Sequence, residues 1–133
     1  DVYLFDLFQK PWSSGFGQSR FSDVYASDDK EVRRRFETYG DVQVITGDVR
    51  ETARSVLDRV PIAFVHMDLN EPEIETELLE SIWKNIVSGG LVLLDDYANA
   101  GMEGSYAAMN RFAVEHQLAI LSTAAGQGIL KKP

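Results

Sequence analysis

The chain has 133 residues, 44% hydrophobic and 26% charged, a composition typical of one globular domain over residues 1–133. Its formal net charge of −8 repels phosphate backbones and anionic lipids, so we expect neither a nucleic acid nor a membrane as partner, although net charge alone leaves a tRNA or capped-RNA substrate open. The chain has no cysteine, no apolar stretch near the ~20 residues that span a bilayer and no signal peptide before its first strand, which excludes thiol chemistry and predicts a cytoplasmic protein.

The chain opens with an apolar, aromatic strand over residues 2–5 that ends on Asp6. Residues 9–26 then combine proline, glycine and several serines with four aromatic residues, which predicts a long irregular loop. Loops of this length are usually functional or disordered, and the aromatic side chains favour a lid that packs on another surface.

A helix and a second strand come next. Ser27 is expected to cap a helix over residues 28–39. The arginines at 33–35 lie among Asp and Glu residues, which indicates a solvated helix face. Residues 42–46 form the following strand, with Asp48 just beyond its end.

The middle of the chain predicts two more helices, each followed by a strand. Residues 49–59 form the first helix, and residues 62–67 the strand after it. In the second helix, over residues 73–87, isoleucine or leucine recurs every fourth residue. Gly89-Gly90 is expected to end that helix, before a strand over residues 91–94.

The last elements are a helix over residues 103–116 and two short strands, 118–122 and 128–131, that end the chain as a hairpin. Strands alternate with helices up to this hairpin. The predicted fold class is therefore α/β, with a Rossmann-like sheet that is mostly parallel and carries a terminal antiparallel pair.

Acidic residues follow two of the apolar strands. Asp68 comes directly after the run that ends at Met67, and Asp95 and Asp96 follow the run 91–94. Carboxyl ends of parallel strands form the ligand crevice of open α/β sheets, so we expect these three carboxylates at one rim. Crowded carboxylates repel one another, which favours a cation or a ligand's hydroxyl and amine groups as neutralising partners. The alternative is that Asp95 caps the next segment while Asp68 and Asp96 are solvated loop acids.

For four further side chains, a functional role is compared with a structural one. His66 is a candidate base two residues before Asp68, but a satisfied core histidine is the favoured interpretation. His116 lies at a helix C-terminus, where a positive charge is favourable, and Trp83 is interpreted as core. Tyr97 fits either an acceptor pocket or packing under the sheet.

The order of elements resembles class I S-adenosylmethionine-dependent methyltransferases from their second strand onward. Four segments resemble the macrocin O-methyltransferase (TylF/MycF-type) group within that class: YLFDLF at 3–8, GDVRET at 47–52, HMDLN at 66–70 and SGGLVLLDDY at 88–97. The Gly-Gly strand followed by Asp-Asp-Tyr is the most specific of these, and the resemblance spans nearly the whole chain.

This resemblance implies a cofactor site in the first third of the chain. Asp6 would accept hydrogen bonds from the ribose hydroxyls of S-adenosylmethionine. Asp48 would face the adenine amino group, with Val49 against the ring.

The resemblance also implies a magnesium site. Asp68, Asp95 and Asp96 match the positions at which metal-dependent members hold Mg²⁺ against the substrate's oxygens, and hard oxygen ligands suit that ion. Asp68 is the best candidate to receive the acceptor's proton and is our candidate catalytic residue.

The chain departs from the family pattern in three ways. Asn70-Glu71-Pro72 stands where relatives often have Asp-Leu-Tyr. The glycine-rich turn has no counterpart, since Gly15 and Gly17 follow the wrong strand. The central first strand of the family is absent, so we expect the C-terminal portion of a larger enzyme, or a strand supplied by another chain.

These observations predict O-methylation of a small-molecule hydroxyl by S-adenosylmethionine with divalent-metal assistance. A nicotinamide-binding Rossmann domain is one alternative, with Asp6 as its ribose acid, but it leaves residues 95–97 unexplained. A non-catalytic α/β interaction module is another. The expected partner is a small-molecule acceptor, and homo-oligomerisation is left open.

Overall fold

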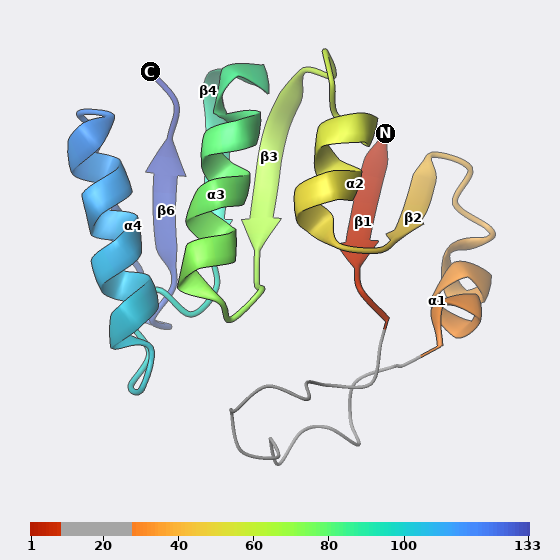
Figure 1. Cartoon of the computed structure of the whole chain (residues 1–133), viewed down its shortest axis with the longest axis horizontal. Helices are drawn as coiled ribbons and strands as arrows, with labels where there is room; N and C mark the ends of the chain where they lie inside the picture. The colour runs from red at the N-terminus through yellow and green to blue at the C-terminus, as the bar shows by residue number, and fades with distance from the viewer. Residues whose placement is uncertain (9–27) are drawn as a thin grey trace. The chain divides into compact units, whose positions relative to one another are not determined.

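The computed structural model describes residues 1–8 and 28–133, and the predicted lid over residues 9–26 lies outside that part (Figure 1). The described residues form two compact units, Asp1–Thr52 and Ala53–Pro133, and each is treated by itself. Our expectation of one domain stays a prediction. Among the helices described, none combines the length and the apolar character that a bilayer crossing requires.

The first unit is built on two parallel strands, β1 (Val2–Asp6) and β2 (Val42–Thr46). Helix α1 (Asp29–Phe36) lies between them in sequence, and two residues separate the end of β2 from α2 (Val49–Val56). Asp28 caps α1 by accepting a hydrogen bond from the backbone N of Lys30 at 3.0 Å, while Ser27 lies outside the described residues. Both strands were predicted from their apolar runs.

The second unit is a four-stranded mixed sheet with the order β3-β4-β6-β5. The pair β3–β4 is parallel, while β4–β6 and β5–β6 are antiparallel. The predicted terminal hairpin is therefore confirmed. The elements of this unit, besides the end of α2, are β3 (Ile62–Met67), α3 (Pro72–Ile82), the 3-10 helix η1 (Trp83–Asn85), β4 (Ile86–Leu94), α4 (Glu103–Glu115), β5 (Leu121–Ser122) and β6 (Gly128–Lys131).

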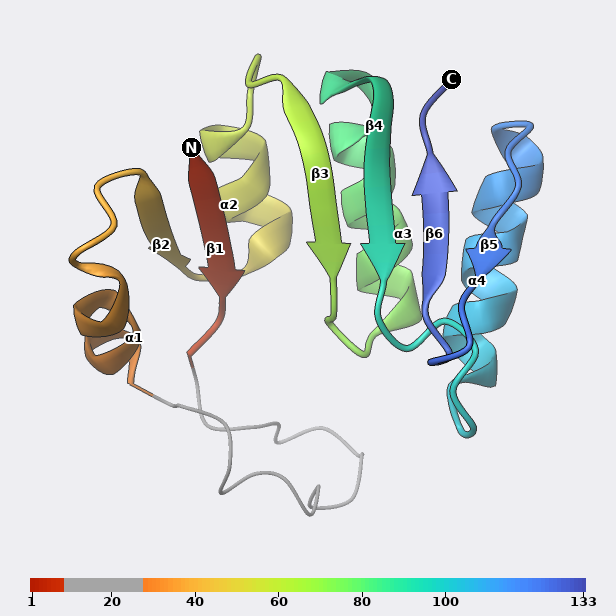
Figure 2. The ribbon, with the colours of Figure 1, turned by 180° about the vertical axis from the view of Figure 1, so that it is seen from behind.

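Helices α3 and α4 cover one face of this sheet, as the two opposite views in Figures 1 and 2 show. The core lies between them and the strands. Its largest fully buried side chains come from both helices and from β4 and β6: Leu79, Met109, Val92 and Leu130. Alternate residues of β4 point to this core, since Val92 and Leu94 are buried while Leu91 is 40% exposed.

One predicted boundary is wrong. The helix predicted over 73–87 ends at Ile82, and β4 begins at Ile86, so Gly89-Gly90 lies within the strand. Ile86 continues the four-residue spacing of the helix, yet it pairs with Ile62 of β3. The register between β3 and β4 shifts at this point, where Gly89 adopts a φ of 81° that favours glycine. The glycines therefore form an irregularity in a long strand.

The remaining differences are small. The predicted helices 28–39, 49–59 and 103–116 form but end earlier, at Phe36, Val56 and Glu115. The predicted strand 118–122 shortens to Leu121–Ser122.

Candidate functional site

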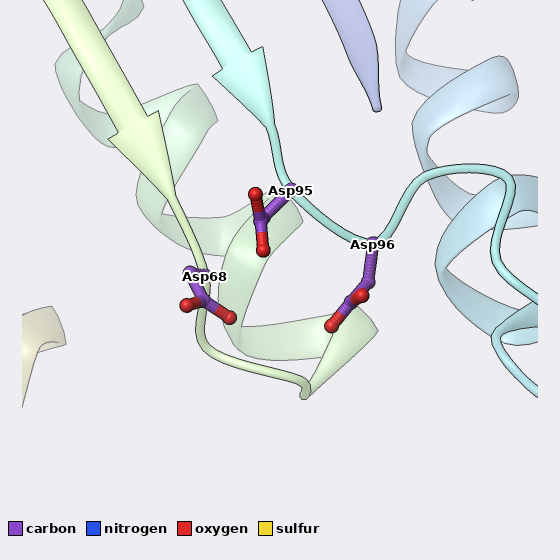
Figure 3. Close-up of side chains that lie close together, drawn as sticks. All are labelled: Asp68, Asp95 and Asp96. Atoms are coloured by element: carbon purple, nitrogen blue, oxygen red, sulfur yellow. The ribbon is translucent and has the colours of Figure 1, made fainter. Parts of the chain in front are cut away.

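The three predicted carboxylates of the second unit lie together. One oxygen from each of Asp68, Asp95 and Asp96 can be chosen so that all three atoms lie within 4.8 Å of one another. Figure 3 shows the three side chains grouped just beyond the ends of β3 and β4. The expected rim of acids is confirmed as a geometric cluster.

The parallel pairing of β3 with β4 produces this grouping. Met67 is in register with Leu94, so the next residue of each strand leaves the sheet at the same level. The backbone N of Asp95 donates to the carbonyl oxygen of Met67 at 3.0 Å. That hydrogen bond extends the ladder by one step and holds Asp95 beside Asp68.

Asp68 has a perturbed carboxyl group. Partial burial raises the pKa of Asp68 above its ordinary value of 3.8, and the charges of Asp95 and Asp96 raise it further. His66 and a hydrogen bond from Asn70 act in the opposite direction on that pKa. The net effect makes Asp68 a stronger proton acceptor than a solvated aspartate.

Each carboxylate of the cluster accepts a hydrogen bond at Oδ1 from a side-chain amide. Asn70 Nδ2 donates to Asp68 at 3.3 Å, and Gln127 Nε2 donates to Asp95 at 2.7 Å. Asn99 Nδ2 donates to Asp96. The amide donors come from the turn after β3, the turn before β6 and the loop after β4.

A small pocket of about 10 Å³, near the volume that one water molecule requires, adjoins the three carboxylates. It is lined by the cluster and by Glu75, Leu94, Tyr97, Ser105 and Met109. Glu75 is 7% exposed, and its Oε1 accepts hydrogen bonds from the backbone N of Leu69 and Asn70 at 3.1 and 3.0 Å. Burial raises the pKa of Glu75, although these two donors oppose the rise.

The interpretation of His66 as a core residue is wrong. Its side chain is 49% exposed, and Nε2 lies 3.5 Å from Asp95 Oδ1. The cause is the alternation of β3, because the next residue, Met67, is buried in the core. His66 therefore faces away from α3 and α4 but remains beside the acidic cluster.

The side chain of Tyr97 packs against α4 and lines the small pocket beside the acidic cluster. Its ring is 5% exposed and lies 4.9 Å from the ring of Tyr106, while its hydroxyl donates to Asn110 Oδ1 at 3.1 Å. Burial raises the pKa of the Tyr97 hydroxyl.

Trp83 and His116 form an aromatic group with Phe112. The Trp83 ring is half-buried, meets Phe112 edge-on at 5.2 Å and lies 5.4 Å from the His116 ring. His116 caps the C-terminus of α4, as predicted, and its Nε2 lies 2.8 Å from Glu80 Oε1. Trp83 and His116 therefore take part in the packing between η1 and the C-terminal end of α4.

The first unit places Asp6 and Asp48 at the same end of its parallel pair. Asp6 is in register with Thr46, and its carbonyl accepts a hydrogen bond from Gly47 N at 3.0 Å. Its exposed carboxylate accepts from Phe8 N at 2.9 Å. Asp48 follows Gly47 directly, so both acids occupy the carboxyl edge of the two strands.

Asp48 is held by Arg50. Both carboxylate oxygens of Asp48 accept hydrogen bonds from the guanidinium group, and Oδ1 also accepts from the backbone N of Arg50 at 2.9 Å. These contacts lower the pKa of Asp48 to about 2. Val49, the first residue of α2, is half-buried beside it.

The residues of the acidic cluster fit a hard divalent cation. All three donors are carboxylate oxygens, which Mg²⁺ prefers. Oxygens bound to one Mg²⁺ lie at most about 4 Å apart, so these three oxygens, which lie within 4.8 Å of one another, would draw slightly closer around the ion. Among the described residues, no lysine or arginine forms an ion pair with the cluster, and the nearby His66 ring is charged only when protonated, so the negative charge of the cluster is largely uncompensated.

Comparison with known proteins identifies the family. A family model described as "Methyltransferase domain" matches residues 1–97, and the chain belongs to this methyltransferase family. No curated protein matches the chain. The match includes Asp6, Asp48 and all three acids of the cluster.

Solved structures agree with this fold. NovP, an O-methyltransferase, is 20% identical with a TM-score of 0.79 over 98% of this chain and 59% of its own. CalS11, described as a TDP-rhamnose 3'-O-methyltransferase in calicheamicin biosynthesis, is 22% identical with a TM-score of 0.66 over 98% of this chain and 58% of its own. PaMTH1 of Podospora anserina, solved with bound SAH, is 14% identical with a TM-score of 0.60, covering 86% of this chain and 58% of its own.

The fold is thus the Rossmann-like α/β fold of class I S-adenosylmethionine-dependent methyltransferases, as predicted. The chain spans 59% of NovP and 58% of CalS11. Membership of the TylF/MycF-type group and the absence of a central first strand stay predictions.

Proposed function

We propose that this chain forms part of an enzyme that transfers a methyl group from S-adenosylmethionine to a hydroxyl oxygen of a small molecule, with help from a divalent cation. The observation that carries the proposal is the grouping of Asp68, Asp95 and Asp96 in a chain of the methyltransferase family. The descriptions of NovP and CalS11 as O-methyltransferases support oxygen as the acceptor atom. The SAH bound to PaMTH1 supports the cofactor.

The first unit supplies residues suited to the cofactor. Asp6 is exposed at the end of β1, where its carboxylate can accept two ribose hydroxyls. Asp48 and Val49 stand at the start of α2 and are assigned to the adenine amino group and ring. Arg50 already occupies both oxygens of Asp48, so adenine would share this carboxylate with the guanidinium group.

The second unit supplies residues suited to the acceptor. Asp68, Asp95 and Asp96 would hold Mg²⁺, which when bound lowers the pKa of a coordinated hydroxyl and fixes its direction. Asp68 would also take the acceptor's proton, because it is the carboxylate assigned beside the coordinated hydroxyl. In the transfer, the acceptor's O–H bond breaks, an O–CH₃ bond forms and the S–CH₃ bond breaks, which leaves S-adenosylhomocysteine. The remaining work of the protein is alignment.

Isothermal titration of the purified full-length protein with S-adenosylmethionine, with and without Mg²⁺, tests the proposal. Saturable cofactor binding is expected in both conditions, and methylation of small hydroxyl compounds is expected to stop in excess chelator. NADH is the matched control ligand, since its binding in place of S-adenosylmethionine would indicate a nicotinamide domain. If neither ligand binds, the non-catalytic alternative is favoured.

A further inference from the structure

The amide groups around the acidic cluster form a pattern. All three are side-chain carboxamides, and all three donate to Oδ1. Because an ionised carboxylate has no proton to donate, each amide must present its nitrogen. Within the described chain, Oδ2 of each aspartate accepts no hydrogen bond. One oxygen per carboxylate is therefore fixed, and the other remains available.

The position of Gln127 depends on a closely packed turn. The backbone N of Ala98, in the loop after β4, donates to the carbonyl of Gly126 at 2.7 Å. Gly126 has a φ of 84°, and a Cβ there would lie 2.1 Å from Asn99 Oδ1. Thr123 Oγ1 accepts from the backbone N of Gln127 at 3.2 Å. The β5–β6 turn is thus held against the loop that carries two acids of the cluster.

The charge of the donors matters as much as their positions. An arginine or lysine could orient a carboxylate equally well, but it would cancel the negative charge that attracts a cation. A carboxamide fixes the oxygen and leaves that charge intact. Partners of this kind around metal-binding carboxylates commonly change metal affinity 10–100-fold when mutated.

We infer that Asn70, Asn99 and Gln127 form a neutral amide collar that positions the three aspartates, each through one oxygen, for a divalent cation. Gln127 is its main positioning residue, since its hydrogen bond to Asp95 joins residues 32 apart in sequence and is anchored by the packed turn. This inference rests on the metal assistance proposed above and adds residues outside the acidic cluster itself.

Calorimetric titration of the full-length protein with Mn²⁺, in the presence of S-adenosylhomocysteine, tests the collar. We expect Gln127→Ala to weaken Mn²⁺ binding by about 10-fold, at the low end of the usual range for such partners. Gln127→Lys is expected to weaken it further, because the ammonium group would still reach Asp95 but would neutralise it. Gln117→Ala, the same change at an exposed position after α4, is the matched control. Affinity for S-adenosylhomocysteine is expected to stay constant in all three variants.

The outcomes separate the collar from the proposed function. If the wild-type protein binds Mn²⁺ and Gln127→Ala binds it equally well, the collar is overturned while metal assistance stands. Restored affinity in Gln127→Lys would also overturn it, because a purely structural contact to the turn would be satisfied by lysine. If wild-type protein binds no Mn²⁺, metal assistance and the collar both fail. Should Gln127→Ala fail to fold, Asn99→Ala on the exposed loop is expected to show the same loss of Mn²⁺ affinity.

Discussion

The buried carboxylate of Glu75 accepts a hydrogen bond from the backbone N–H of Asn70 at 3.0 Å. The same oxygen accepts the N–H of Leu69, so one side chain of α3 fixes the turn that follows β3. Asn70 has a φ of 58° in this turn, a conformation that residues other than glycine seldom adopt. Glu75 therefore stabilises the turn that carries Asp68.

Glu75→Ala is expected to destabilise the protein by about 2 kcal/mol, because it removes a buried carboxylate and leaves the backbone N–H groups of Leu69 and Asn70 without their acceptor. Glu75→Gln is expected to lose much less, since the amide oxygen can accept both hydrogen bonds. Urea denaturation of the two variants measures the difference. Equal losses would show that the charge of Glu75, and not its acceptor geometry, holds the turn.

The raised pKa of Glu75 predicts a pH dependence of stability. Burial raises this pKa above its ordinary value of 4.5. At pH values between the ordinary pKa and the raised one, the folded state therefore binds more protons than the unfolded state. The contribution of protonated Glu75 to the free energy of unfolding is fully present below pH 4.5 and is lost as the pH rises through the raised pKa. The glutamine in Glu75→Gln cannot ionise. The free energy of unfolding of this variant, relative to that of wild type, is therefore expected to increase from about pH 4 to pH 7. A difference that stays flat or shrinks with pH would contradict the raised pKa.

The strands and the acidic cluster were predictable because their signals are local. Apolar runs end at Met67 and Leu94, and parallel pairing then brings the following acids together without further information. Ile86 misled the prediction, since its four-residue spacing from Ile82 fits a helix while its pairing with Ile62 is decided by the sheet. Local spacing cannot report a partner that lies elsewhere in the chain.

The partners of the cluster were not predictable for the same reason. Gln127 reaches Asp95 across 32 positions, and nothing in the sequence of its turn indicates a carboxylate partner. Glu75 sits in a helix among other acids and differs from them in burial, which the sequence does not reveal. His66 was assigned to the core because alternation fixes two faces of a strand but not which face is covered.

Gly128→Ala is expected to destabilise the protein by about 1–3 kcal/mol through overpacking. A Cβ at this position would lie 2.7 Å from Cγ of the buried Tyr97 ring and 3.0 Å from Cγ2 of Ile120. Gly40→Ala is the control, since a Cβ there meets nothing within 4 Å. Thermal unfolding of both variants measures the effect. A Gly128→Ala variant as stable as Gly40→Ala would mean that the Tyr97 ring moves freely, contrary to its packing on Tyr106.

The assignment of Asp6 to the cofactor and of Asp95 to the metal predicts that their loss affects different steps. Asp95→Asn is expected to lower kcat roughly 100-fold with little change in S-adenosylmethionine affinity, because this residue is assigned to the metal and the acceptor. Asp6→Asn is expected to weaken cofactor binding about 10-fold, the effect of losing one charge-assisted hydrogen bond. Calorimetry measures the affinity and single-turnover kinetics with saturating cofactor measures the chemical step.

Equal losses of cofactor affinity in both variants would place the acidic cluster on the cofactor side. Full activity of wild-type protein in excess chelator would make the cluster a structural feature, because three carboxylates that needed no cation would have to be neutralised by the fold itself.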